Sequence, residues 1–316
     1  MLVSVIITTY NSEKFIIRAL ESVLLQSYEN FEILVVDDCS TDETINILQK
    51  YKEKISIIKK KNNSGPANSR NLGIKQSKGD LICFLDADDY WMQDKLKKQV
   101  AYAKAYPEIG IFSNNIYSVS QEKILSKRFN HIKIFQPKKI RHGVVENYLR
   151  STGRYSFHPP SIIMVRRKLF IEHGMFDEKF ISVEDSELIL RWILKGIKIY
   201  YNDEVLGCYE ISNNQSLTKN FELWCKNHFS YWYNFNLKNL ETKKKKLFIR
   251  MRKKTLLESL YVLIKKDNLK LSKFYLFKFK KDLFSFKWIF LVILCFLPIN
   301  FFLKIRNYVK STNYFF

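Results

Sequence analysis

Two stretches of buried-type residues end in carboxylates, at 35–38 (VVDD) and at 84–89 (FLDADD). In an open parallel sheet, ligands bind outside the carboxyl ends of the strands. Asp86 and Asp88 alternate just past a strand, so both side chains can reach one divalent cation, whose other oxygen ligands diphosphate and water would supply. The pattern therefore indicates a site for a hard cation and a nucleotide.

Each acidic pair also has a structural interpretation. Asp88 or Asp89 could cap a helix that begins near Tyr90, and the pair at 37–38 could form a turn with the next two residues. A third pair at 184–185 precedes apolar residues at helical spacing, which is typical of a helix N-terminus. Taken alone, no pair decides between structure and chemistry.

Strands and helices alternate along the part of the chain that must position these residues. The alternation predicts βαβ crossovers and a mostly parallel sheet. Strands are expected at 2–8, 31–36, 55–58, 81–85, 161–165 and 197–201. Helices are expected at 13–26, from a capping box at 40–43 to residue 49, and at 67–76 and 186–195.

Positive charge is concentrated at the end of the chain. The net charge of the 316 residues is +22, but residues 219–316 hold 22 Lys and Arg against 5 Asp and Glu. The same 98 residues contain 24 of the 48 aromatic residues. We therefore expect two parts, a nearly neutral domain at 1–218 and a basic, aromatic-rich helical region at 219–316.

Several classes of protein are disfavoured. The five cysteines have no CxxC spacing, so neither a disulfide framework nor a zinc site is expected, and a reducing compartment is the default. Residues 1–7 lack the basic start of a signal peptide and predict a strand. The sequence has no GxGxxG or Walker loop, which argues against dehydrogenases and P-loop NTPases.

The order of the motifs resembles the family 2 glycosyltransferases over roughly residues 1–218. This resemblance implies the GT-A fold, an α/β Rossmann-like domain with a mostly parallel sheet flanked by helices. The matching stretches are SVIITTYN (4–11), ALESVLLQS (19–27), EILVVDDCSTD (32–42), GPANSRNLG (65–73), GDLICFLDADD (79–89), GMFD (174–177) and VEDSEL (183–188).

The resemblance also implies a donor, a nucleotide-diphospho-sugar, for which UDP is the family's common nucleotide. It assigns donor-binding roles as follows: Thr8 and Tyr10 would line the pocket for the base, Asp38 would hydrogen-bond base or ribose, Arg70 would face the nucleotide, and Asp86 would contact ribose or metal. Asp86 and Asp88 would bind Mn²⁺ or Mg²⁺, which would neutralise charge on the leaving group.

Asp185 takes the role of general base by the same resemblance. One carboxylate accepts the proton of the acceptor hydroxyl while the oxygen attacks the anomeric carbon. No second carboxylate is needed as a nucleophile, so the transfer should invert the configuration. The expected enzyme is a metal-dependent, inverting glycosyltransferase of the hexosyltransferase type.

One segment departs from the family pattern. The family often has an Arg and a His after the last strand, where Glu210 and Ser212 stand here. Diphosphate contacts from this loop are therefore not expected, which leaves a nearby Lys or His as the substitute.

The basic region contains a run of twelve apolar residues at 288–299. It reaches spanning length, 283–303, only by including Lys287 and Asn300, and basic residues flank both sides. An amphipathic or shallowly inserted segment on an anionic membrane surface is the favoured interpretation, with a single-pass anchor as the alternative. We therefore expect a peripheral enzyme at the cytoplasmic face of the membrane, acting on a glycan or lipid-linked acceptor.

Two other functions are considered. A sugar-phosphate nucleotidylyltransferase would need a Gly-rich loop after the first strand, but residues 8–12 contain no glycine. A polyanion- or membrane-binding protein with a non-catalytic GT-A domain would also suit the charge. The positive charge lies beside an apolar run, which favours a membrane over nucleic acid, so no nucleic-acid partner is expected.

Overall fold

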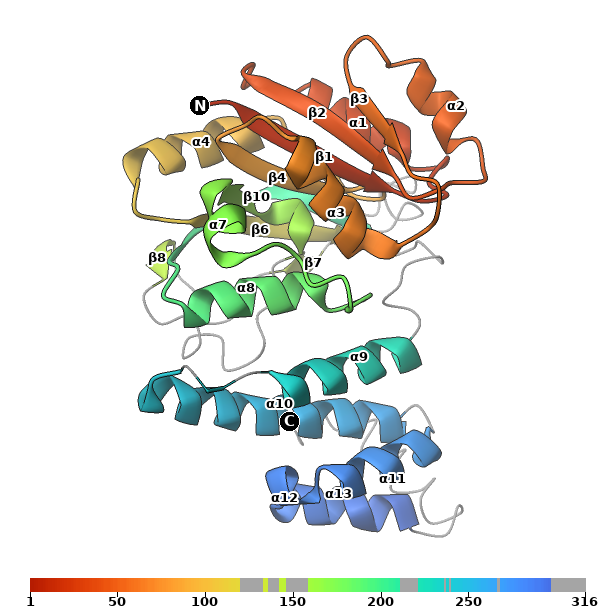
Figure 1. Cartoon of the computed structure of the whole chain (residues 1–316), viewed down its shortest axis with the longest axis vertical. Helices are drawn as coiled ribbons and strands as arrows, with labels where there is room; N and C mark the ends of the chain where they lie inside the picture. Colours follow the sequence, from red (N-terminus) through yellow and green to blue (C-terminus); the bar gives the residue numbers. More distant parts are fainter. Residues whose placement is uncertain are drawn as a thin grey trace. The chain divides into compact units, whose positions relative to one another are not determined.

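The computed structural model describes residues 1–119, 133–135, 142–145, 159–210, 221–235, 237–238, 240–265 and 268–296. The chain forms two compact units, shown in Figure 1. The N-terminal unit consists of residues 1–152 and 156–219, and the C-terminal unit of 153–155 and 220–316.

The N-terminal unit contains one mixed sheet in the order β3-β2-β1-β4-β9-β6-β10-β5, with β7 on β6 and β8 on β10. The first four strands in this order are parallel, as are β6 and β10, while β9 runs antiparallel between β4 and β6. The predicted α/β fold with a mostly parallel sheet is confirmed. The strands are β1 (Val3–Thr9), β2 (Phe31–Asp37), β3 (Ser56–Lys59), β4 (Leu81–Asp86), β5 (Tyr90–Trp91), β6 (Ile111–Val119), β7 (Lys133–Phe135), β8 (Gly143–Val145), β9 (Met164–Arg166) and β10 (Ile199–Glu210).

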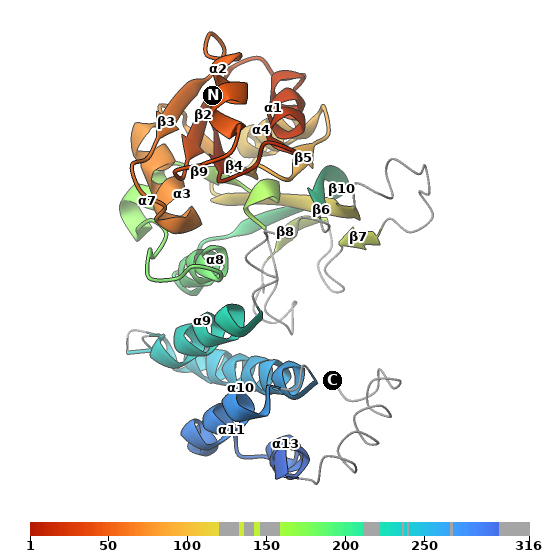
Figure 2. The same ribbon diagram turned by 90° about the vertical axis from the view of Figure 1, so that its right-hand side faces the viewer.

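Helices cover both faces of the sheet, as Figures 1 and 2 show. Successive side chains of a strand point to opposite faces. Val3, Val5 and Ile7 of β1 therefore share a core with α1, α2 and α4, whereas Ile6 packs on Gly73 of α3. A Cβ at Gly73 would lie 2.5 Å from Ile6, so glycine allows the close approach of α3. The helices are α1 (Ile16–Leu24), α2 (Thr44–Gln49), α3 (Gly65–Gln76), α4 (Lys95–Ala105), α7 (Lys168–His173) and α8 (Glu184–Leu194).

The register of β1 brings the two acidic strand ends together. Thr8 is paired with Val36 on one side and with Asp86 on the other. Just past the strands, the Asp38 amide donates to the Thr9 carbonyl (2.8 Å) and the Ala87 amide donates to the Thr8 carbonyl (3.2 Å). Both acidic segments therefore emerge at one edge of the sheet, on either side of β1, as expected for parallel neighbours.

The expected helix after β2 begins later than the capping box predicts. The Thr41 amide donates to the Asn11 side chain (2.8 Å) and the Glu43 amide donates to the Glu13 side chain (3.1 Å), and α2 begins at Thr44 with no side-chain cap. The reason is tertiary: the loop after β1 supplies the hydrogen bonds that a local capping box would otherwise make.

The segment after β4 is also not helical at first. Tyr90 and Trp91 form β5, which pairs antiparallel with β10, and α4 begins only at Lys95. The interpretation of Asp88 or Asp89 as the cap of a helix near Tyr90 is therefore wrong. The strand expected at 161–165 is shorter, with a 3₁₀ turn at Pro160–Ile162 before β9.

The C-terminal unit is helical in its described part. Its core uses many of the aromatic residues of this region: Phe229 stacks on Tyr275 with ring centroids 4.0 Å apart, and Trp232 packs on Phe248. None of its described helices combines the length and apolarity that a membrane crossing requires. Residues 297–303 of the predicted insertion segment lie outside the described residues. The helices are α9 (Phe221–Asn234), α10 (Thr242–Lys265), α11 (Leu269–Lys278), α12 (Lys280–Leu283) and α13 (Phe286–Phe296).

Candidate active site

A buried arginine joins three elements at the carboxyl edge of the sheet. Arg70 of α3 is 4% exposed. Its Nη2 donates to Asp86 Oδ1 at the end of β4 and its Nη1 donates to Glu184 Oε1 at the start of α8, both at 2.7 Å. The guanidinium carbon also lies 5.6 Å from the centre of the Phe176 ring. We call Arg70, Asp86, Glu184 and the neighbouring Asp185 the Arg70 cluster.

Burial sets the acid strengths in the Arg70 cluster. Burial disfavours the charged form of Arg70, but the carboxylates of Asp86 and Glu184 outweigh it and raise its pKa. Burial raises the pKa of Glu184 to about 7, with Arg70 opposing the shift. Burial likewise raises the pKa of Asp185, again against the effect of Arg70. The cluster therefore contains a permanent cation beside two carboxyl groups that ionise at higher pH than usual.

Asp185 does not cap its helix. The N-cap of α8 is Val183, and no side chain caps the first turn. Asp185 is partly exposed, and its Oδ1 accepts a hydrogen bond from the Ser186 amide at 2.6 Å. The Ser186 side chain also hydrogen-bonds this carboxylate, which remains partly exposed and can accept a proton from a ligand.

The acidic end of β4 divides between the site and the core. Asp86 and Asp88 are partly exposed, whereas Asp89 is buried. Asp89 accepts hydrogen bonds from Ser161 Oγ (2.5 Å) and the Glu210 amide (3.0 Å). Burial, together with the nearby Asp88 and Asp86, raises its pKa well above the ordinary value. Asp89 is therefore a structural residue, and only the alternating pair remains for a ligand.

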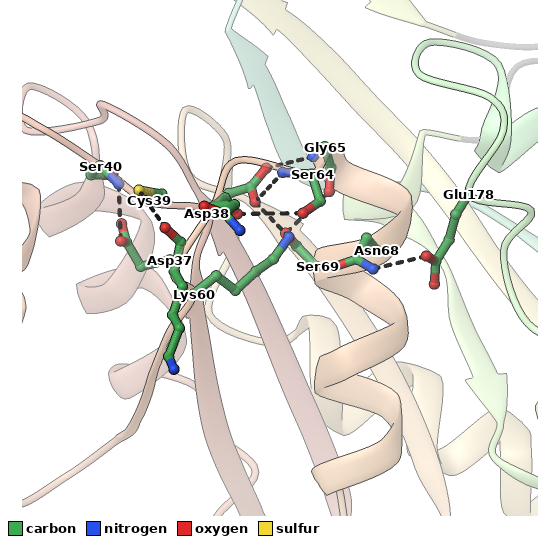
Figure 3. A network of polar contacts seen from close by, with 12 residues as sticks. Asp37, Asp38, Cys39, Ser40, Lys60, Ser64, Gly65, Asn68, Ser69 and Glu178 are labelled. Atoms are coloured by element: carbon green, nitrogen blue, oxygen red, sulfur yellow. Dashed lines mark hydrogen bonds and ion pairs between the residues drawn. The ribbon is translucent and has the colours of Figure 1, made fainter.

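Asp38 belongs to a separate network, shown in Figure 3. Its Oδ1 accepts from the Ser64 amide (2.9 Å) and from Lys60 Nζ (2.5 Å), and its Oδ2 accepts from the Gly65 amide (2.7 Å). Lys60 also donates to Ser69 Oγ at 3.1 Å. Gly65 has a φ of +83°, which favours glycine. Asp38 thus holds the loop that leads into α3, the helix of Arg70.

The remaining predicted residues lie at the end of β1. The Thr8 hydroxyl is 3.4 Å from Asp86 Oδ1, so Thr8 borders the Arg70 cluster. Tyr10 follows the strand and is 47% exposed. The fold therefore brings both Thr8 and Arg70 into contact with Asp86. Asp185 directly follows Glu184, the other ion-pair partner of Arg70.

Two charged residues of the site are not predicted from the sequence. The pattern marks Glu184 only as part of a helix start and gives no signal for Lys60. Both are ion-pair partners of predicted site residues, and Glu184 stands within a matching motif. The neighbouring Asn71 also links two motifs, because its side chain exchanges hydrogen bonds with the Phe176 backbone, each at 3.0 Å. The adjacent residues Arg70 and Asn71 of α3 thus hold different segments of the site.

The acidic pair has the chemistry of a divalent-cation site without being a complete cage. In the described part of the chain, no three His, Cys, Asp or Glu side chains come together to hold a metal ion. Asp86 Oδ2 makes no hydrogen bond with the described residues, and carboxylate oxygens suit Mg²⁺ and Mn²⁺. The residues therefore fit a cation held by Asp86 and Asp88, whose other ligands come from a bound diphosphate and water.

Comparisons with known proteins show the family of the chain. Residues 4–174 match the family model described as glycosyl transferase family 2. A relative from Escherichia coli, UDP-Glc:alpha-D-GlcNAc-diphosphoundecaprenol beta-1,3-glucosyltransferase WfaP, is 36% identical over 198 residues, which are 62% of this chain and 72% of that protein. The structure of S. aureus TarS 1-349 in complex with UDP is 26% identical, with a TM-score of 0.60 over 79% of this chain and 70% of that one. The same protein with UDP-GlcNAc is 22% identical, with a TM-score of 0.70 over 100% and 94%, and shows the likeness of fold.

Replacing Arg70 with an uncharged residue should leave the buried carboxylates of its cluster unpaired. We expect Arg70→Met to lower the free energy of unfolding by about 3–5 kcal/mol at pH 8. The loss should be smaller at pH 5.5, where Glu184 can take up a proton instead. Urea unfolding at both pH values measures this.

The double variant Arg70→Met/Glu184→Met is the matched control, because it removes the ion pair as a unit. It should recover most of the lost stability. A double variant as unstable as Arg70→Met would show that the unpaired Glu184 carboxylate is not the cause.

Proposed function

The chain belongs to glycosyl transferase family 2, and we propose that it is an inverting, metal-dependent enzyme that transfers a sugar from a UDP-sugar to a hydroxyl group of a glycan or lipid-linked acceptor. The observation that carries the proposal is the Arg70 bridge, because it ties the carboxylate of the proposed metal site to the segment of the proposed base. Donor site and base are thus parts of one cluster.

The donor would bind at the carboxyl edge of the sheet. Thr8 and Tyr10 at the end of β1 would line the pocket for the base, and the exposed ring of Tyr10 is available for stacking. Asp38 would contact base or ribose while it keeps the loop before α3 in place. UDP as the nucleotide is supported by the structure of S. aureus TarS in complex with UDP.

The charge of the site favours a bound cation. Asp86, Asp88, Glu184, Asp185 and Glu210 are grouped with two arginines, so an anionic diphosphate would meet more carboxylates than cations. Mn²⁺ or Mg²⁺ held by Asp86 and Asp88 would neutralise the charge of the departing nucleoside diphosphate. Arg70 keeps Asp86 Oδ1 occupied, which leaves Oδ2 for the ion.

Asp185 would act as the base through its partly exposed carboxylate. The proton of the acceptor hydroxyl passes to this carboxylate as the hydroxyl oxygen attacks the anomeric carbon and the bond to the diphosphate breaks. Glu184 is buried against Arg70 and is not placed to attack the sugar. One base and no carboxylate nucleophile give a single displacement, which inverts the configuration.

The acceptor is proposed from two observations. The name of the E. coli relative specifies a sugar on a diphosphoundecaprenol, which is a lipid-linked acceptor. In the C-terminal unit, exposed apolar side chains stand among lysines on α11 to α13. These are Phe274, Phe277, Phe284, Ile289 and Ile293, with Lys270, Lys278, Lys280, Lys281 and Lys287. Such a surface suits anionic lipid at the cytoplasmic face of a membrane.

The first test is calorimetric titration of UDP into the protein with Mn²⁺ and then with EDTA. We expect binding only with the metal, and we expect Asp88→Asn to weaken it by at least about tenfold, since a charged ligand contact is worth about 1.5–3 kcal/mol. Asp80→Asn, at the opposite end of β4, is the control and should bind UDP normally. Equal UDP affinity of the wild type and Asp88→Asn would show that Asp88 does not bind the metal.

Asp185→Asn should separate chemistry from binding. We expect sugar transfer to fall about 10²–10⁴-fold, the usual contribution of a general base, with UDP affinity unchanged. Because burial raises the pKa of Asp185, and the base must be ionised, the wild-type rate should fall as the pH drops through a value above the usual pKa of an aspartate. This acid limb should be absent from the residual rate of Asp185→Asn; its persistence would assign the limb to another group.

Vesicle flotation tests the membrane contact. We expect the protein to float with phosphatidylglycerol vesicles, but not with phosphatidylcholine vesicles, at about 150 mM salt, a physiological condition. We expect no binding to duplex DNA at the same salt concentration. Phe274→Ser/Phe284→Ser should reduce flotation, while Ile171→Ser, an exposed apolar residue of α7, should not. Unchanged flotation of Phe274→Ser/Phe284→Ser would show that this surface does not contact the membrane.

A further inference from the structure

Arg18 of α1 lies beside the acidic end of β4 and has no role in the donor site as described above. Its Nη2 donates to the Asp88 carbonyl at 2.7 Å and to Glu210 Oε2 at 3.2 Å. Its guanidinium carbon lies 4.6 Å from the centre of the Tyr90 ring. These contacts come from two segments of the N-terminal unit, 88–90 and Glu210, and fix the guanidinium next to the backbone of the proposed metal ligand Asp88.

The position of Arg18 leaves part of its hydrogen-bonding capacity unused. Its side chain is 29% exposed, whereas that of Glu210 is fully buried. Among the described residues, none accepts a hydrogen bond from Arg18 Nη1, and the buried Nε also has no acceptor. An arginine presents five N–H donors and binds phosphate in a two-point fashion. Within the described part of the chain, only Nη2 has acceptors, so Nη1 can serve a ligand.

The pairing of Arg18 with Glu210 places a positive charge beside the acidic segment. Glu210 is the last residue of β10, and its fully buried carboxylate is paired with Arg18 of α1. The same Nη2 contacts the backbone of Asp88, one of the two proposed metal ligands. The carboxylates of Asp86 and Asp88 repel an anion, so the guanidinium at this point would lower the electrostatic cost of bringing a diphosphate to them.

We propose that Arg18 is a diphosphate-binding residue, which donates from Nη1 to the phosphate groups of the nucleotide-sugar. Glu210 and the Tyr90 ring hold the guanidinium in place for this contact. The inference rests on the proposed function, because it needs a nucleotide diphosphate at Asp86 and Asp88. It adds a contact beyond those of Arg70, which is 4% exposed and binds a carboxylate with each terminal nitrogen.

Calorimetric titration of UDP and UMP with Mn²⁺ tests the proposal on the full chain. Arg18→Gln should weaken UDP binding about 10- to 100-fold, as expected for a charged hydrogen bond, and UMP binding much less, because UMP lacks the second phosphate. Arg18→Lys should keep part of the affinity for UDP. Arg166→Gln, a half-buried arginine at the opposite end of the sheet beside Leu81, is the matched control and should bind both ligands as wild type does.

A double variant separates ligand binding from structural support. If Arg18 served only to neutralise the buried Glu210, Arg18→Gln/Glu210→Gln would restore UDP binding. We expect the defect of Arg18→Gln to persist in the double variant. Restored binding, or equal loss of UDP and UMP affinity, would overturn the assignment of Arg18. Failure of the wild type to bind UDP would instead contradict the proposed function, so the two failures can be told apart.

Discussion

A guanidinium in the protein interior requires carboxylates to accept its hydrogen bonds, and the site of this protein is built around that requirement. Arg70 is 4% exposed, and its two terminal nitrogens bind Asp86 and Glu184 at 2.7 Å. A buried ion pair is often no more stabilising than apolar residues of similar size. What the pair provides here is position, because α3, the end of β4 and the start of α8 are fixed relative to one another. The Asp38 network, which anchors the loop before α3, supports the same arrangement from the other side of β1.

The central place of β1 explains why residues far apart in sequence meet at this edge. Its last two carbonyls, of Thr8 and Thr9, accept hydrogen bonds from the amides that begin the two acidic segments. A shift of register by one residue would turn every side chain of the strand to the other face. Ile6 could then no longer pack on Gly73, and Arg70, one turn away on the same helix, would lose its distance to Asp86. The packing of an apolar residue in the sheet therefore sets the geometry of the charged site.

The sequence predicts the elements and the alternating carboxylates because these depend on local pattern. Strand β4 is a continuous apolar run that ends in Asp86, and Asp88 follows two residues later. This spacing is visible in the sequence without any knowledge of tertiary contacts. The errors occur where tertiary contacts replace local ones. Asn11 bonds the amide of Thr41, so α2 begins late, and β10 recruits Tyr90 as a strand residue. The partner of Arg70 could not be predicted either, because an ion pair across 114 residues leaves no periodic signal.

The distribution of charge separates the two parts of the chain. The excess of lysine and arginine lies in residues 219–316, whereas the site is rich in carboxylates. The net charge of +22 therefore says nothing about the affinity of the site for a diphosphate, which depends on groups within a few ångströms. At that range Arg18 and Arg70 are each paired with carboxylates, and these pairings determine which of their donors remain for a ligand. Arg70 uses both terminal nitrogens to hold carboxylates, while Arg18 uses one and keeps the other. The exposed phenylalanines and lysines of α11 to α13 lie in the other unit, and the polyanion that we propose for them is an anionic lipid surface, which suits both residue types.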